Sequence, residues 1–339
     1  MRTAIGGAQS AGRATGWVLL ALGCPLGSAF GQGDVADTVP PATVVETSHT
    51  FRSGPVSLEG TLARPRSGGR IPIAVIVAGS GPTDRNGNAA AGIRPNTYAQ
   101  LAWRLAERGV ASLRYDKRVL PTARGPVDVA NLAFDDFAGD LAAAVRSVGS
   151  DARFAQVVVA GHSEGGALAI RAVTNGLELS GIALVATAGR PLGPILREQL
   201  ARQVDAATLA RFDTAMALYL AGENPGDVPA ALMPLFLPVN RRYTQTVAQF
   251  DPVAELRATA LPLLILQGAA DLQVTVADAE ALHRARPDAR LVVLPETNHV
   301  LKGVADTTLM GQLSTYQNPT IPIVGSVVDE LVSWIGSLR

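Results

Sequence analysis

The residue of this sequence that most clearly indicates a chemical role is a serine flanked by glycines. Residues 161–165 read Gly-His-Ser-Glu-Gly, with Ser163 at the centre. An apolar stretch at 157–160 precedes it, and a helix-like stretch at 167–173 follows it. A G-x-S-x-G sequence between a strand and a helix is typical of a nucleophilic serine held on a sharp, strained turn. Without that context, it would indicate only a strand-to-helix turn that contains a serine.

A serine hydroxyl is a poor nucleophile at neutral pH, so it needs a base that takes its proton. The chain has four histidines. His49 lies in an N-terminal hairpin pattern, His162 adjoins the serine and should point elsewhere, and His283 falls inside a helical pattern. His299 follows the apolar stretch 291–294 in a late loop. We therefore predict that His299 is the base.

The base needs an acid that fixes its tautomer and stabilises the imidazolium. Asp271 comes soon after the apolar stretch 261–266 and precedes His299 by 28 residues, which leaves room for one helix and one strand. Glu296 is the rival, although it lies on the same loop as His299. In the alternative interpretation, Asp271 only caps a helix that begins near Thr275. We predict Asp271 as the third member of the triad.

The oxyanion formed during acyl transfer must be met by backbone N–H groups. We predict one from Glu164, the residue after the nucleophile. The second should come from the loop after the apolar stretch 71–78, with Ser80 as first choice and Gly81 as second. The side chain of Glu164 needs no chemical role, because a carboxylate at a helix N-terminus is favoured by the helix dipole.

Elements of two kinds must position these residues. Apolar stretches alternate with amphipathic ones, which predicts a mainly parallel α/β sheet covered by helices on both faces. A hairpin is expected at 43–65. The remaining expected strands are 71–78, 110–115, 157–160, 182–186, 261–266 and 291–294, and the expected helices are 98–105, 134–148, 167–173, 277–286 and 327–338.

Residues 191–256 interrupt this alternation. The segment is helical at first and then apolar and proline-rich, and it is too long for a simple connection between two strands. We predict a small helical cap over the carboxyl edge of the sheet, where open α/β sheets bind ligands. Its apolar residues could line a substrate site or simply pack the cap: Met216, Leu218, Leu220, Leu232, Met233, Leu235, Phe236 and Leu237.

Composition narrows the class of protein. The chain has 339 residues, is 47% hydrophobic and 17% charged, and carries 29 basic and 29 acidic residues. With no net charge and no basic run, neither nucleic acid nor a membrane surface is indicated as a partner. No H-x-x-x-H motif or Cys/His cluster indicates a metal site.

The N-terminus is typical of an export signal. Arg2 and Arg13 precede an apolar run at 17–24, and small residues follow. This pattern predicts a secretory signal over 1–31, a periplasmic or secreted protein without a membrane span, and a hydrolase domain over 36–339. The single cysteine, Cys24, lies in the signal, and lipoprotein anchoring through it is the weaker alternative.

A resemblance to a known family covers about residues 43–339. It is carried by three stretches of sequence: 78–88 (Ala-Gly-Ser-Gly-Pro-Thr-Asp-Arg-Asn-Gly-Asn), 114–118 (Arg-Tyr-Asp-Lys-Arg) and 161–166. The chain resembles α/β-hydrolases, in particular small bacterial carboxylesterases related to dienelactone hydrolases and serine aminopeptidases. The resemblance implies the α/β-hydrolase fold and cofactor-free hydrolysis of an ester or amide through an acyl-enzyme. One departure is Val119-Leu120-Pro121, where such proteins usually continue with glycine.

Three functions remain open at this stage. The first is a carboxylesterase on small or medium acyl esters. The second is an aminopeptidase-like amidase, which needs a carboxylate in the cap to hold an amino group. Its candidates are Glu198, Asp205, Asp213, Glu223 and Asp227. The third is a catalytically silent binding protein, which an intact triad disfavours. The sequence leaves the oligomeric state open.

Overall fold

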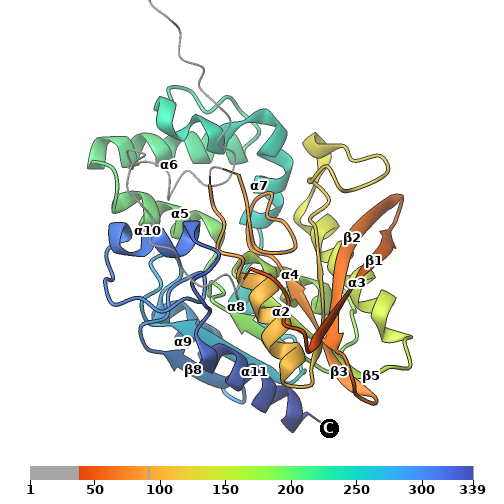
Figure 1. Cartoon of the computed structure of the whole chain (residues 1–339). Helices are drawn as coiled ribbons and strands as arrows, with labels where there is room; N and C mark the ends of the chain where they lie inside the picture. Colours follow the sequence, from red (N-terminus) through yellow and green to blue (C-terminus); the bar gives the residue numbers. More distant parts are fainter. Residues whose placement is uncertain (1–37, 91, 339) are drawn as a thin grey trace, which may run out of the picture.

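One mixed sheet of eight strands forms the centre of the protein in the computed structural model, which describes residues 38–90 and 92–338. The strand order is β1-β2-β4-β3-β5-β6-β7-β8 (Figure 1). The first two strands form an antiparallel hairpin whose second strand pairs antiparallel with β4, and the other pairs are parallel. The strands are β1 (Val44–Ser53), β2 (Val56–Pro65), β3 (Ile71–Val77), β4 (Ala111–Tyr115), β5 (Phe154–His162), β6 (Gly181–Val185), β7 (Leu263–Gly268) and β8 (Arg290–Leu294).

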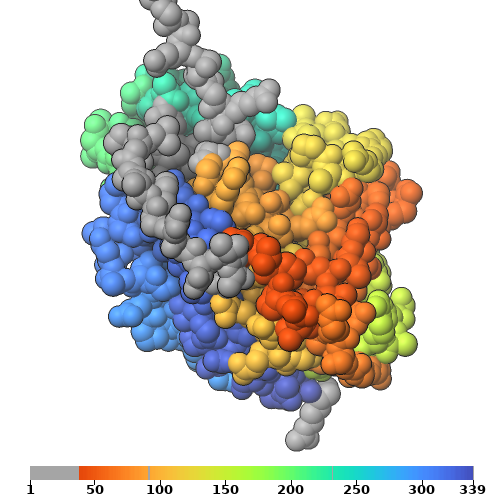
Figure 2. All heavy atoms as spheres, viewed as in Figure 1, coloured from red at the N-terminus to blue at the C-terminus, as the bar shows by residue number. Residues whose placement is uncertain are grey.

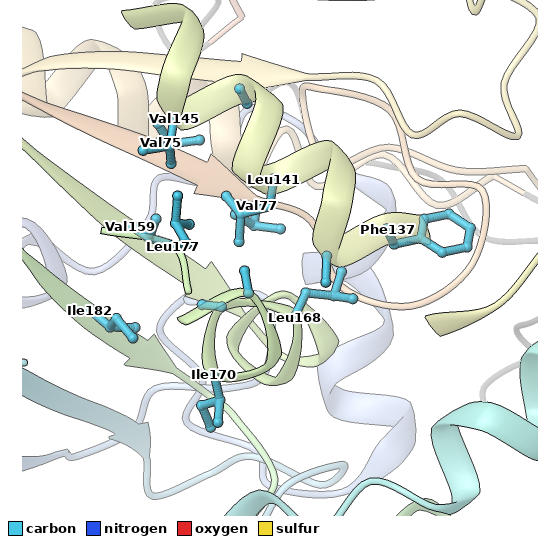
Figure 3. Close-up of a cluster of buried hydrophobic side chains, with 14 of the residues drawn as sticks. Val75, Val77, Phe137, Leu141, Val145, Val159, Leu168, Ile170, Leu177 and Ile182 are labelled. Carbon is cyan, nitrogen blue, oxygen red and sulfur yellow. The ribbon is translucent and has the colours of Figure 1, made fainter. Parts of the chain in front are cut away.

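Two apolar cores lie on the two faces of this sheet, because successive side chains of a strand point to opposite faces. On β3, Ile73, Val75 and Val77 belong to one core, whereas Ala74 and Ile76 belong to the other. Helices α3 (Phe134–Gly149), α4 (Glu164–Thr174) and α9 (Val276–Ala285) cover the first face, and α2 (Thr97–Glu107) and α11 (Gly325–Ser337) cover the second. Figure 3 shows part of the first core.

A group of helices lies between β6 and β7, over residues 191–256, which we call the cap segment. Its elements are α5 (Leu192–Ala201), α6 (Ala206–Leu220), η3 (Ala230–Phe236), η4 (Pro238–Asn240), α7 (Arg241–Ala248) and α8 (Pro252–Arg257). Residues of α5, α6 and η3 share a small apolar core of their own that includes Leu200, Phe212 and Tyr219. Helices α7 and α8 pack instead on the first core of the sheet, through Val247 and Leu256. In Figure 2 the cap segment, green to teal, forms the top of the molecule.

The predicted α/β fold is confirmed, and each expected strand and helix is present within a few residues of its predicted bounds. Outside the cap segment, two further elements were not predicted: η2 (Val129–Asn131) and α10 (Leu309–Gln317). Within the cap segment, η3, η4, α7 and α8 were not predicted individually. None of the helices within residues 38–90 and 92–338 has the length and apolarity that crossing a membrane requires. The predicted signal over 1–31, including Cys24, lies outside the described residues.

Candidate active site

Ser163 occupies a strained turn between β5 and α4. Its backbone has φ 55° and ψ −122°, a conformation that non-glycine residues seldom adopt. The Ser163 amide donates to the carbonyl of Val185 at 2.8 Å, which fixes the turn to the end of β6. The strain is therefore held by the neighbouring strand, and the serine projects at the carboxyl edge of the sheet.

The two glycines of the motif allow this turn to form. A Cβ atom on Gly161 would lie 2.5 Å from the Gly165 carbonyl oxygen, and one on Gly165 would lie 2.3 Å from the Val77 carbonyl oxygen. Both distances are impossible for real side chains. Helix α4 can therefore start directly against β3 and β5 only because these two positions lack side chains.

His299 and Asp271 meet at the same edge of the sheet. Asp271 follows β7, His299 follows β8, and the His299 Nδ1 atom lies 2.8 Å from the Asp271 Oδ2 atom. The carboxylate is fully buried and the imidazole is 6% exposed. With Nδ1 bound to the carboxylate, the other ring nitrogen, Nε2, is left for a substrate or for Ser163. Ser163 and His299 line one cavity, whereas Asp271 lies behind His299.

The alternatives for the acid lie elsewhere. Glu296 is exposed, and its backbone has a positive φ of 51°. Helix α9 is capped by Thr275, together with Asp278 in a capping box, so Asp271 is not its cap. Asp271 instead accepts hydrogen bonds from the amides of Gln273 and Val274 at 2.7 and 3.0 Å, which orient the carboxylate.

The contacts of His162 with the site were not predicted from the sequence, which indicated only that this side chain should point away from Ser163. Its ring packs against that of His299, with 4.8 Å between centroids. His162 Nε2 lies 2.8 Å from the His299 carbonyl oxygen, and Nδ1 lies 2.9 Å from the Tyr98 hydroxyl. A carbonyl oxygen can only accept, so Nε2 carries the proton and Nδ1 accepts from Tyr98. The Tyr98 oxygen in turn accepts from the Gly79 amide at 3.0 Å.

This chain of bonds requires a neutral His162. Burial, helped by the adjacent His299, lowers the pKa of His162 to about 3, so the ring is uncharged at neutral pH. The chain links the loop after β3 to the backbone of His299. His162 thus connects Tyr98 to the backbone of His299 and is not a second base.

Three amides near Ser163 are free to bind an oxyanion. The amides of Ser80, Gly81 and Glu164 donate to no other group among the described residues. All three residues line the cavity that contains Ser163. The geometry leaves both Ser80 and Gly81 available as partners of the Glu164 amide.

The side chain of Glu164 makes contacts that the sequence reasoning did not anticipate. Its Oε2 accepts from the Ser80 hydroxyl at 3.0 Å, and its Oε1 accepts from Lys117 Nζ at 2.9 Å. Burial by itself raises the pKa of Glu164, but the Lys117 ammonium, together with hydrogen bonds from the Tyr243 and Ser80 hydroxyls, holds that pKa below its ordinary value. Glu164 is therefore an ionised group inside the site.

The cavity over Ser163 has a volume of about 550 Å³ and a mostly apolar wall. The sheet side contributes Val119, Leu132 and Phe137, and the cap segment contributes residues from α5, α6, η3 and α7. Of the eight apolar cap residues considered from the sequence, only Met216 and Leu235 line it. Val119 belongs to the loop that departs from the expected glycine, and it now forms part of the wall. Among the described residues, no cluster of His, Cys, Asp or Glu is arranged to hold a metal ion.

Comparison with known proteins agrees with this geometry. A model described as "Alpha/beta hydrolase family" matches residues 74–301, about two thirds of the chain, and that range contains Ser163, Asp271 and His299. The chain belongs to the alpha/beta hydrolase family. This membership, together with the mostly parallel sheet, confirms the resemblance noted in the sequence and supports assignment as a hydrolase.

The chain is also similar to a curated esterase and to solved structures of other proteins. Esterase EstD of Thermotoga maritima is 25% identical over 308 residues, which cover 89% of this chain and 70% of that protein. Est1E of Butyrivibrio proteoclasticus with bound ferulic acid superposes with a TM-score of 0.55 at 16% identity, over 85% of this chain and all of Est1E. A proline iminopeptidase of Mycobacterium smegmatis superposes with a TM-score of 0.54 at 16% identity, over 86% of this chain and 98% of that protein. At 16% identity, the last two comparisons show a shared fold and no more.

Proposed function

We propose that this protein is a serine carboxylesterase that hydrolyses small or medium acyl esters through an acyl-enzyme on Ser163. The observation that carries the proposal is the buried His299–Asp271 pair, which opens onto the same cavity as a serine on a strained turn. The esterase relative from Thermotoga maritima supports the same reaction class.

The proposed reaction uses each group in turn. His299 Nε2 takes the Ser163 proton as Oγ attacks the ester carbonyl, and Asp271 stabilises the imidazolium that forms. The amides of Glu164 and of Ser80 or Gly81 bind the oxyanion. His299 then protonates the leaving alcohol, and a water molecule, activated by the same base, releases the acid. No cofactor is needed for any step.

The charges of the cavity favour a neutral substrate. Within the described part of the chain, the Asp, Glu, Lys and Arg residues that line it are Lys117, Arg190 and Glu164. Lys117 is paired with Glu164, and Arg190 is paired with Asp278 at 2.7 Å and with Glu198 at 2.5 Å. No uncompensated charge in the described wall would hold a free carboxylate or an ammonium group.

The lack of an uncompensated charge in the described cavity wall also weighs against the amidase alternative. None of the five cap carboxylates considered for an amino group lies in the described cavity wall. Glu198 binds Arg190 and Arg202, Asp213 binds Arg197, and Asp227 binds Arg211. Asp205 caps α6 by accepting from Thr208, and Glu223 is exposed. An amine would therefore meet no free carboxylate from this set.

A direct comparison of substrates tests the proposal. We expect p-nitrophenyl acetate and butyrate to be hydrolysed and aminoacyl p-nitroanilides to be cleaved at least about 100-fold more slowly in kcat/KM, with Ser163→Ala as the background control. Faster cleavage of an aminoacyl anilide with a free amino group than of its N-acetylated form would favour the amidase instead. Binding of esters without turnover would favour the silent binding protein.

A further inference from the structure

We propose that Glu164 is a positioning residue for the oxyanion hole: its carboxylate, fixed by Lys117, holds the Ser80 loop beside Ser163. The inference rests on the proposed function, in which the amides of Glu164 and the Ser80 loop meet the oxyanion. It assigns a task to two ionised side chains that the triad does not use.

The contacts join the ends of three strands. Ser80 follows β3, Lys117 follows β4 and Glu164 follows β5, and the Glu164 carboxylate bonds to the other two side chains at 3.0 and 2.9 Å. Lys117 also lies over the Phe137 ring, 5.6 Å from its centroid. The lysine side chain is only 6% exposed and that of Glu164 only 13%. The Lys117–Glu164 bond is therefore both charge-assisted and largely shielded from solvent, and a charge-assisted bond is stronger than a neutral one. Ser80 itself is exposed, so the Ser80–Glu164 bond lies at the solvent-accessible side of this group.

The arrangement links the two donors to each other. The residues whose amides would meet the oxyanion, Ser80 and Glu164, are also joined through their side chains. The Ser80 carbonyl also accepts a hydrogen bond from the Thr83 hydroxyl at 3.0 Å. Because oxyanion donors act only when they are aimed at the developing charge, fixing their separation raises kcat rather than substrate binding.

Lys117 has a second effect in this arrangement. A bare carboxylate next to the oxyanion would repel the charge that develops during the reaction. The Lys117 ammonium compensates the negative charge of the Glu164 carboxylate and also anchors that carboxylate. The pair can therefore brace the loop without opposing the reaction.

The test compares Glu164→Ala, Glu164→Gln and Ser80→Ala in the full chain, with p-nitrophenyl butyrate as substrate. We expect Glu164→Ala and Ser80→Ala each to lower kcat by about 10- to 100-fold with KM within about threefold, because a misplaced donor weakens only the transition state. Glu164→Gln, which keeps an acceptor for Ser80, should retain at least about a third of kcat. The kcat of the double variant Ser80→Ala/Glu164→Ala should be no more than about twofold below that of the poorer single variant, because the two substitutions remove the same hydrogen bond.

Glu255→Ala is the matched control. Glu255 pairs with Arg171 at 3.0 Å and is 20% exposed, but it lies outside the described cavity wall, so its loss should leave kcat within about twofold. Fluorophosphonate labelling of Ser163 to completion shows whether each variant keeps its nucleophile, and a melting curve shows whether it is folded.

The outcomes separate the two claims. If Glu164→Ala and Ser80→Ala both keep wild-type kcat, or if their losses multiply, the positioning role is wrong although the esterase proposal stands. If Glu164→Ala does not fold, Ser80→Ala and Glu164→Gln decide, and a kcat loss that is as large in the glutamine variant as in Ser80→Ala contradicts the inference. If the wild-type protein neither hydrolyses esters nor labels at Ser163, the proposed function itself fails.

Discussion

The Nδ1 atom of His299 lies 2.8 Å from the Oδ2 atom of Asp271, although the two residues come from different strand ends. Asp271 Oδ1 is occupied by two backbone amides, so the carboxylate cannot turn away from the ring. This leaves the imidazole with one free nitrogen and a fixed orientation. The relationship is what a general base beside Ser163 requires.

Substitution of these two residues should cripple turnover to different degrees. We expect His299→Ala to lower kcat by about 10⁴- to 10⁶-fold and Asp271→Asn by about 10²- to 10⁴-fold, because losing the base costs more than losing the group that orients it. Steady-state hydrolysis of p-nitrophenyl butyrate measures both. Glu296→Gln is the control and should stay within about twofold. Severe loss in that control with a harmless Asp271→Asn would show that the acid is misassigned.

The Tyr98 hydroxyl should matter for both stability and rate. Tyr98→Phe leaves the Gly79 amide and His162 Nδ1 without their shared partner, and each unsatisfied buried group costs about 1–3 kcal/mol. We expect the free energy of unfolding to fall by about 2–6 kcal/mol, the sum for the two groups, and kcat to fall several-fold, as measured by urea denaturation and ester hydrolysis.

Tyr219→Phe is the comparison for that experiment, since it removes one hydroxyl that donates to the Leu237 carbonyl in the cap segment at 2.6 Å. It should cost less stability and leave kcat nearly unchanged. Equal kcat losses in the two variants would contradict a special role for Tyr98.

The sheet and the spacing of Ser163, Asp271 and His299 were predictable because they depend on local patterns. Apolar stretches with punctuating glycines mark the strands, and parallel strands bring their carboxyl ends to one edge. Helix α10 was not predictable in the same way. Its buried face includes Gln312 and Thr315, so it shows no apolar periodicity.

The side-chain bonds around the site could not be read from the sequence for a different reason. Tyr98, Lys117 and His162 come from separate elements, and their contacts depend on the distances between strand ends. The phrases that contain Ser80, Lys117 and Glu164 were singled out by resemblance, which marks residues without showing how they pair. The cap lining was equally hidden: Phe236 lies in the cap's own apolar core, 3% exposed, while its neighbour Leu235 faces the cavity.

Protonation of His162 should destabilise the protein in mild acid. Burial lowers its folded-state pKa from 6.5 to about 3, so the unfolded chain binds a proton that the folded protein excludes. The stabilisation is present above about pH 6.5 and is lost as the pH falls toward about 3, amounting to about 2 kcal/mol between pH 7 and 5. His162→Gln should remove about that much of the pH dependence of the unfolding free energy.

His49→Gln serves as the matched histidine substitution. His49 is only partly buried, and burial lowers its pKa as well. Its effect on the same pH dependence should be smaller than that of His162→Gln. An identical pH dependence in wild type and His162→Gln would show that the buried ring is not excluded from protonation.

Residues of the cap segment should govern substrate size. Each methylene buried in the apolar cavity contributes about 0.8 kcal/mol, so kcat/KM should rise about three- to fourfold per carbon until the acyl group fills the space. Leu235→Ala, which enlarges the wall, should move the preferred acyl group to a longer chain while acetate hydrolysis stays within about tenfold.

Met233→Ala is the control for the cap, because Met233 lies in the same η3 helix but is 46% exposed and outside the described wall. It should leave the acyl-length profile unchanged. A loss of several orders of magnitude on both acetate and longer esters in folded Leu235→Ala would indicate a chemical role for the cap.

The central claim is that Ser163 is the nucleophile, and covalent labelling tests it most directly. The native protein is treated with a fluorophosphonate, digested, and the modified peptide is sequenced by mass spectrometry. The account predicts one phosphonylated residue, Ser163, with loss of ester hydrolysis in step with labelling and no labelling of a folded Ser163→Ala variant. Labelling at another serine such as Ser80, or full activity in Ser163→Ala, would contradict it.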